Sequence, residues 1–195
     1  DRFESRGLGD VYKRQHMPVK NLRHLPKAHL HLHLEGAMRP ATLTEFCARY
    51  KIERPSDTRG QQFSNFTAFN EVYRAASDSI RTKQDLARVI QEVAEDAAKD
   101  GANWIEPAFD ADRYTILRAD RSLRLFETPY EGWLFALEAA RNASEKTGVG
   151  ISFISAIDRT RPIEQANERA KLTTNLISSQ KHQITAKNIN GGEPY

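Results

Sequence analysis

Histidines occupy every second position in one short stretch of the chain, and this is the most unusual chemical feature of the sequence. His29, His31 and His33 alternate with leucines over residues 27–34, and Glu35 follows the last histidine by two residues. Strict alternation is the period of a β-strand, in which every second side chain points to the same face. The histidines and the glutamate are therefore predicted to share one face of a strand, and the leucines to form the opposite, buried face.

Neutral imidazole is the side chain that most often binds metal ions in proteins. Two histidines separated by one residue can reach a single ion from the end of a strand, and zinc accepts such nitrogen ligands at about 2.0–2.1 Å. A catalytic zinc site also keeps one position open for water. The histidine face therefore predicts a metal site. The alternative is a solvent-exposed strand that happens to be rich in histidine.

The elements that must position this strand alternate between helix and strand. Thr82 and Asp85 approximate a capping box, and Gly101 and Gly148 suit the ends of helices. Pro107 is unfavourable within a predicted strand, because proline has no N–H to donate to the hydrogen-bond ladder of a sheet. We expect strands at 27–34, 103–109 and 149–157, and helices beginning near 40 and 66, at 82–100, at 129–146 and beginning near 162. This order implies a parallel sheet with right-handed crossovers.

The segment LPKAHLHLHLEGA, residues 25–37, resembles the first-strand signature of the adenosine deaminase family within the amidohydrolase superfamily. The family signature has two metal-binding histidines one residue apart, followed by an acidic residue and a glycine. The resemblance implies that His31 and His33 are zinc ligands. It also implies that Glu35 contacts the ribose end of the substrate. His29 precedes the first implied ligand by two residues, so a supporting or solvent-facing role is expected for it.

Three further segments are similar to the same family. FTAFNEVY at 66–73 resembles the aromatic helix that covers the substrate pocket, which implies substrate-binding roles for Phe66 and Phe69. Plain core packing is the alternative reading of these two rings. WIEPAFD at 104–110 and GISFISAIDR at 150–159 resemble the second and third strands. Altogether the resemblance covers about residues 22–177.

The resemblance implies an α/β fold, the N-terminal portion of a (β/α)8 TIM barrel. The chain supplies about three β/α units with extra helices after the first strand, whereas a closed barrel takes about 250 residues. We expect residues 17–177 to form this partial barrel. Residues 1–16 read as a non-native or disordered leader, since most of them resemble a translated sequencing adapter. Residues 178–195 read as a polar tail that is either disordered or out of frame.

The implied function is hydrolytic deamination of a 6-aminopurine nucleoside, adenosine or a close relative, by a zinc-activated water in the full-length parent. The acid and base residues, a third histidine ligand and an aspartate ligand come from later strands in the family. We therefore assign no catalytic acid or base to this chain, place His182 in solvent, and expect the chain alone to be inactive. The alternatives are another amidohydrolase with the same histidine pair, or a non-catalytic metal-binding fragment.

Composition and charge pattern argue against a nucleic-acid-binding protein and against a membrane-spanning protein. The 195 residues are 39% hydrophobic and 28% charged, with a net charge of +3, which is ordinary for a soluble globular protein. The charges are interspersed and form no basic block, so nucleic acid is not an expected partner despite a pI near 9.0. No apolar run is long enough for a membrane span, and the single Cys47 requires no oxidising compartment. We expect a cytoplasmic protein whose partner is a small-molecule purine nucleoside; the oligomeric state stays open.

Overall fold

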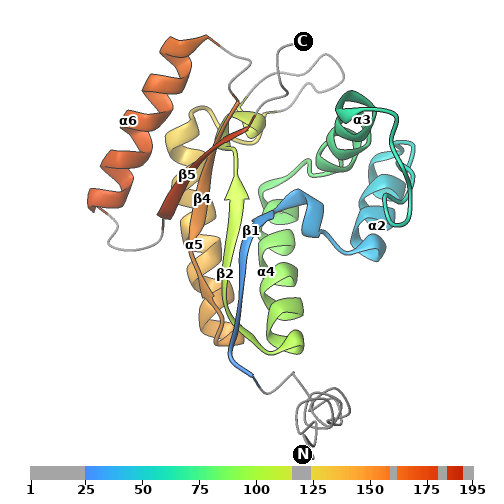
Figure 1. The fold of residues 1–195 in the computed structure, drawn as a ribbon, viewed down its shortest axis with the longest axis horizontal. Coiled ribbons are helices and arrows are strands. Elements are labelled where there is room, and N and C mark those ends of the chain that lie inside the picture. Colours follow the sequence, from blue (N-terminus) through green and yellow to red (C-terminus); the bar gives the residue numbers. More distant parts are fainter. Residues whose placement is uncertain (1–24, 116–123, 159–161, 180–183, 191–195) are drawn as a thin grey trace, which may run out of the picture.

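A computed structural model describes residues 25–115, 124–158, 162–179 and 184–190 (Figure 1). The strands are β1 (Lys27–His33), β2 (Ala102–Phe109), β3 (Gly150–Ile151), β4 (Phe153–Asp158) and β5 (Ile184–Asn190). The α-helices are α2 (Pro40–Tyr50), α3 (Phe66–Ser77), α4 (Lys83–Asp100), α5 (Pro129–Thr147) and α6 (Ile163–Ser179). Two short 3-10 helices, η2 (Glu35–Ala37) and η3 (Ala111–Tyr114), follow β1 and β2. None of the helices in these ranges combines the length and apolar character needed to cross a membrane.

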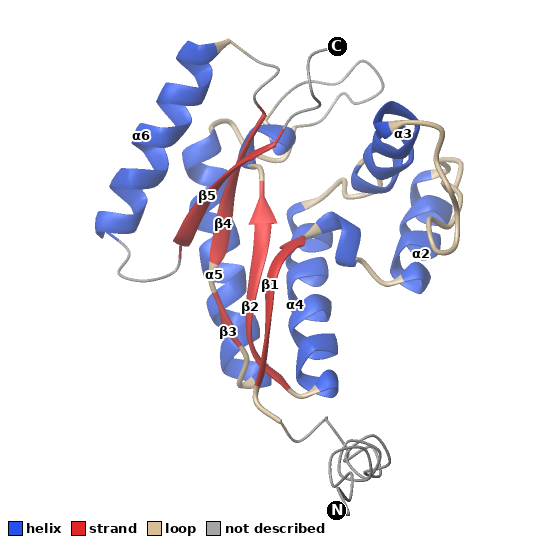
Figure 2. Ribbon diagram, viewed as in Figure 1, coloured by secondary structure: helices blue, strands red, loops and turns tan. Residues whose placement is uncertain are grey.

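The strands form one parallel sheet in the order β1-β2-β4-β5, with β3 paired to β2 (Figure 2). Helices lie between β1 and β2, between β2 and β3, and between β4 and β5, as in βαβ units, and α4 packs against both β2 and α5. The pair α2 and α3 lies to one side of the sheet, beyond the carboxyl end of β1 (Figure 1). The α/β class, the parallel sheet and the extra helices after the first strand are therefore confirmed.

The long helices begin and end at the signals that the sequence contains. The Thr82 hydroxyl accepts a hydrogen bond from the Asp85 N–H at 3.0 Å, and the Asp85 carboxylate accepts one from the Thr82 N–H at 3.0 Å. This reciprocal pair satisfies amide groups that the first turn of a helix leaves without partners. Gly101 and Gly148 follow α4 and α5 with φ of 83° and 74°, in the left-handed region that glycine enters without strain.

Strand β1 contains one extra residue relative to β2, in its carboxyl-terminal half. Leu30 and Leu32 pair with the adjacent residues Glu106 and Pro107, so His31 is a bulge between them. The φ of His31 is 58°, which is uncommon for a residue that carries a side chain. Pro107 has no N–H to contribute to the ladder, and the bulge lies beside it. The proline in β2 is thus accommodated by an irregularity in the neighbouring strand.

The expectation of a buried leucine face on β1 is correct at one end of the strand and wrong at the other. Leu34 is fully buried, whereas Leu30 is 64% exposed. The bulge at His31 interrupts the alternation on which the expectation rested. In addition, the helices α4, α5 and α6 of the described ranges pack mainly on β2, β3, β4 and β5, whereas β1 contacts mainly β2 and η2. Leu30 is therefore left largely open to solvent.

Two features at the other edge of the sheet differ from the expected pattern. Residues 184–190, which the polar composition placed in a tail, form β5 and pair in parallel with β4 along its whole length. The strand expected at 149–157 is divided into β3 and β4 at Ser152, whose N–H bonds to the Ile105 carbonyl at 3.1 Å. Strand β5 thus follows α6, in a segment whose sequence is too polar to predict a strand.

An aromatic cluster forms the centre of the core between the sheet and α5. The Phe109 ring lies 5.0 Å from the Trp133 ring, 5.6 Å from the Phe153 ring and 5.7 Å from the Tyr114 ring, measured between centroids. All four side chains are buried. Because Tyr114 belongs to η3, the core fixes the position of the short helix that follows β2.

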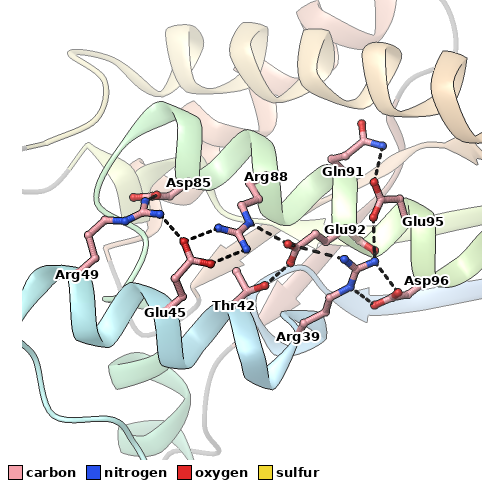
Figure 3. Close-up of polar contacts among 10 residues, drawn as sticks. All are labelled: Arg39, Thr42, Glu45, Arg49, Asp85, Arg88, Gln91, Glu92, Glu95 and Asp96. Atoms are coloured by element: carbon pink, nitrogen blue, oxygen red, sulfur yellow. Dashed lines mark hydrogen bonds and ion pairs between the residues drawn. The ribbon is translucent and has the colours of Figure 1, made fainter.

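Charged side chains join α2 to α4 along one continuous seam (Figure 3). The Arg39 guanidinium donates to Asp96 at 2.6 and 2.8 Å and to Glu95 at 2.9 Å. Further along, the Thr42 hydroxyl donates to Glu92 at 2.5 Å, and other contacts in the seam join Glu45, Arg49, Asp85 and Arg88. The seam holds α2 against α4 and so positions η2, which lies between β1 and α2.

Candidate active site

The two histidines implied as metal ligands lie together at the carboxyl end of β1. The ring centroids of His31 and His33 are 5.7 Å apart with an interplanar angle of 35°, and both residues are open to solvent on one side. Two imidazoles that bind one ion at about 2.0–2.1 Å have ring centres about 5–6 Å apart. The observed separation therefore fits a pair of ligands to a single ion.

His33 has an environment that favours the neutral, metal-binding form of imidazole. Partial burial is the main cause that lowers its pKa, and His31 and Arg113 act in the same direction, against the nearby Glu35 carboxylate. The lone pair of the ring is thus available at neutral pH. No group of three or more potential metal ligands occurs in the described ranges.

Glu35 is buried and held by two phenols. Its side chain sits at the start of η2 and is 4% exposed. The Tyr73 hydroxyl donates to one carboxylate oxygen at 2.7 Å, and the Tyr114 hydroxyl donates to the other at 2.7 Å. Burial, followed by the charge of Glu35, raises the pKa of both tyrosines, so both phenols keep the protons that they donate. The carboxylate is therefore fixed from two different elements, α3 and η3.

Arg113 supplies a positive charge beside this cluster. Its guanidinium lies 5.3 Å from the centroid of the Tyr73 ring and donates to the Ser77 hydroxyl at 3.2 Å. Burial opposes the charged form, but Glu35, Tyr73, Tyr114 and Asp110 together outweigh it and raise the pKa of Arg113. A cation over the ring of a phenol that donates to Glu35 adds to the electrostatic stability of the buried carboxylate.

The aromatic face of α3 leads to the histidine pair. Phe66 packs on Phe69 at 6.2 Å, Phe69 stacks on Tyr73 at 6.3 Å, and the edge of Tyr73 meets His33 at 5.9 Å, all between ring centroids. Phe66 is 55% exposed and Phe69 is 38% exposed. The two phenylalanines therefore lie outside the hydrophobic core, contrary to the alternative of plain core packing, and border the open side of the site.

A cavity of about 330 Å³ adjoins Glu35 on the side of α2 and α3. Glu35, Gly36, Phe69 and Tyr73 contribute to its wall, together with residues of α2 and of the connection at 51–65. This volume lies in the range of small-molecule sites, about 300–1,000 Å³. Glu35 thus belongs both to the cluster beside the histidines and to the wall of the cavity.

The structure brings His31, His33, Glu35 and Phe69 into one region and places Phe66 one helical turn farther along α3. His29 lies away from them, with its ring nitrogen 3.3 Å from Asp100, at the end of α4. Sequence reasoning missed the roles of three residues that surround Glu35. Tyr73 carried a signal, because it follows Phe69 by four residues on a helix face. Tyr114 and Arg113 carried none, since they come from a short helix far along the chain.

Comparison with known proteins assigns the family. Residues 26–194 match the family model described as adenosine deaminase. This chain belongs to the adenosine deaminase family. It is 31% identical over 162 residues to a putative adenosine/adenine deaminase from Streptomyces virginiae, an alignment that covers 79% of this chain and 45% of that protein. The resemblance of the first-strand motif is thereby confirmed.

Solved structures of the family have the same fold. An adenine deaminase from Arthrobacter aurescens superposes with a TM-score of 0.62 and 25% identity, covering 86% of this chain and 49% of that one. An amidohydrolase from Burkholderia ambifaria, described with bound zinc, superposes with a TM-score of 0.65 and 22% identity, covering 92% and 49%. The chain is thus a partial (β/α)8 barrel, and it spans about half the length of the curated relatives that it matches.

Proposed function

We propose that the full-length protein hydrolytically deaminates a 6-aminopurine nucleoside, adenosine or a close relative. The observation that carries this proposal is the His31/His33 pair beside a buried, doubly hydrogen-bonded Glu35, in a chain of the adenosine deaminase family. The products of the reaction are the 6-oxopurine and ammonia.

His31 and His33 would hold a zinc ion, since neutral imidazoles at this separation suit one ion. A zinc ion held there would supply a water activated at neutral pH for attack on C6 of the purine, because zinc lowers the pKa of a bound water towards about 7. The lowered pKa of His33 keeps its ring neutral and ready to bind. The remaining metal ligands and the general acid and base are assigned to later strands of the full-length protein.

Glu35 would accept a hydrogen bond from the sugar of the substrate. Each of its oxygens already accepts one phenol proton, and a carboxylate offers about four lone-pair sites, so further capacity is left. The tyrosines hold the carboxylate in one orientation before substrate binds, which reduces the entropy lost on binding. Phe66 and Phe69, exposed beside Tyr73, would cover the purine and exclude water from it.

The experiment is a measurement of ammonia release and zinc content on the full-length protein. We expect adenosine or another 6-aminopurine nucleoside to release ammonia, and His31→Ala and His33→Ala to lower the rate by more than about 100-fold together with the zinc content. His29→Ala is the matched control, because His29 contacts Asp100 instead of the other histidines. We also expect the 195-residue chain alone to release no ammonia.

Three results would contradict the proposal. The first is full activity and zinc content in both histidine variants. The second is hydrolysis of cyclic amides, with no reaction on any 6-aminopurine, which favours another amidohydrolase activity. The third is a full-length protein that binds zinc in proportion to its concentration but has no hydrolytic activity.

A further inference from the structure

The cavity of about 330 Å³ extends from Glu35 away from the sheet. In the view of Figure 1, the connection at 51–65 runs along the outer side of α2 and α3, whereas η2 lies on the side of the sheet. Both segments contribute to the wall, so the cavity passes between the two helices. The lining includes Glu35 and Gly36 of η2 and residues 54–59 of the connection.

The wall is of mixed character. Apolar side chains contribute to it, among them Met38, Leu43, Phe69 and Val72. The connection at 51–65 contributes the charged residues Arg54, Asp57 and Arg59. Two guanidinium groups and one carboxylate give the connection's part of the wall one net positive charge, while Glu35 adds a carboxylate from η2.

Of the two arginines in the connection, Arg54 makes no direct ion pair within the described part of the chain. Its Nε donates to the Thr44 hydroxyl at 2.9 Å, and a terminal nitrogen donates to the Pro55 carbonyl at 3.3 Å. Both acceptors are neutral oxygen atoms, which orient the guanidinium without forming an ion pair. Arg59, in contrast, is paired with Asp57 at 3.2 Å. This pairing is the main cause of the lowered pKa of Asp57, and the Arg54 charge adds to this effect. Arg54 therefore presents an oriented positive charge in the wall of a cavity.

We propose that this cavity is a subsite for an anionic group carried on the sugar side of the purine substrate, with Arg54 as the residue that selects for it. The inference rests on the proposed function, which places the sugar at Glu35. A substituent beyond the sugar then enters the cavity and ends at Arg54. A guanidinium binds phosphate and carboxylate groups with two parallel hydrogen bonds, so either anion fits this chemistry.

The test compares three substrates on the full-length protein: adenosine, adenosine 5′-monophosphate and adenosine 5′-carboxylic acid. We expect kcat/KM to be at least about 10-fold higher for one or both anionic substrates than for adenosine. Arg54→Gln should lower kcat/KM for the preferred anion by about 10–100-fold and leave adenosine within about twofold. Arg54→Lys, which keeps the charge, should restore part of the loss. The two anionic substrates distinguish a phosphate from a carboxylate.

Arg74→Gln is the matched control, since Arg74 is an exposed arginine of α3 outside the wall of the cavity. It should leave all three values within about twofold. A binding measurement on metal-free protein gives a second readout: adenosine 5′-monophosphate should bind more weakly to Arg54→Gln than to the unmodified protein, and more weakly in high salt.

Two results separate failure of this inference from failure of the proposed function. If adenosine is deaminated as well as both anions, or if Arg54→Gln lowers all three rates equally, the subsite is refuted and the deaminase function stands. If no purine is deaminated, the proposed function is refuted. In that case equal binding of adenosine 5′-monophosphate to the unmodified protein and to Arg54→Gln also refutes the subsite.

Discussion

Glu35 shows how one buried carboxylate can organise a site from distant parts of the chain. Tyr73 and Tyr114 each cap one of its oxygens at 2.7 Å, and they come from α3 and η3. Tyr114 is 2% exposed, so its hydroxyl cannot be replaced by bulk water without local opening. A buried acceptor that loses its donor costs about 1–3 kcal/mol. The pair of phenols is thus a structural support for the site as well as a part of it.

Tyr114→Phe removes one of these donors and keeps the ring in the core. We expect the free energy of unfolding of the full-length protein to fall by about 1–3 kcal/mol, measured by urea denaturation. Tyr130→Phe is the control, because Tyr130 is 49% exposed and should change stability by less than about 0.5 kcal/mol. Equal stability of Tyr114→Phe and the unmodified protein would show that the hydrogen bond to Glu35 contributes nothing.

The two phenols also predict a dependence on alkaline pH. Burial and then the Glu35 carboxylate raise the pKa of Tyr73 and of Tyr114, so the folded protein retains protons that an unfolded tyrosine loses near pH 10. Unfolding therefore releases protons above about pH 10, and the free energy of unfolding falls as the pH rises. Tyr73→Phe should make this fall shallower between about pH 9 and 11, measured by urea denaturation at each pH. An unchanged slope would contradict the assignment.

At the level of helices and strands, the charged seam between α2 and α4 supports the site as the two phenols support Glu35. Arg39 precedes α2 and reaches both Glu95 and Asp96 of α4, and its side chain is 27% exposed. An ion pair at this depth is screened less than a surface pair and keeps two helices in register. The orientation of η2, and with it Glu35, depends on this attachment.

Arg39→Gln should lower the free energy of unfolding by about 1–2 kcal/mol, between the values for exposed and buried pairs. Lys99→Gln is a control on the same carboxylate, because Lys99 lies 3.4 Å from Asp96 but is 70% exposed. It should cost less than about 0.5 kcal/mol. Urea denaturation in low and high salt measures the loss of stability in both variants. A larger loss for Lys99→Gln than for Arg39→Gln would contradict this prediction.

The elements themselves were the part of the structure that local sequence signals could predict. Thr82, Gly101 and Gly148 act through their own backbone or the next turn, so their effect is visible in a short window of sequence. The bulge at His31 was not predictable in this way, because its place depends on which residue of β1 lies beside Pro107. Strand β5 was missed because its support comes from pairing with β4 and not from an apolar pattern.

The residues of the candidate site divide in the same way, into those that local sequence spacing predicts and those that only the tertiary structure brings together. His31, His33 and Glu35 were found because they lie within five residues on one strand end, where spacing alone indicates shared chemistry. Tyr114 reaches Glu35 across 79 residues of sequence, and only the packing of η3 on the core brings the two together. A contact of that kind is a property of the tertiary structure, so no local pattern reveals it.

At the scale of the whole molecule, β1 is an edge of the described sheet with an apolar side chain facing solvent. Leu30 is 64% exposed and Leu25 is 55% exposed. A strand edge with exposed leucines is a template for association with other chains. The 195-residue chain is therefore expected to self-associate when it is purified alone.

Leu30→Lys should raise the monomer fraction of the 195-residue chain at concentrations of about 10–50 μM, measured by sedimentation velocity, because charge on an edge strand opposes pairing. Leu30→Met, similar in size and polarity, is the control and should leave the distribution unchanged. A monomeric unmodified chain, or an equal effect of both substitutions, would contradict this prediction.

The wall of the cavity comes from one continuous stretch of chain, residues 35–76, and from no other part of the protein that the structure describes. Within the described ranges the connection at 51–65 contributes no residue to the hydrophobic core, whereas Phe46 of α2 belongs to it. Mutations in the connection at 51–65 can therefore reshape the cavity while the barrel keeps its stability and the histidine pair keeps its place. In evolutionary terms, substitutions in this stretch can change the range of substrates that a protein accepts. The strands and helices that carry the catalytic residues can stay under constant selection meanwhile.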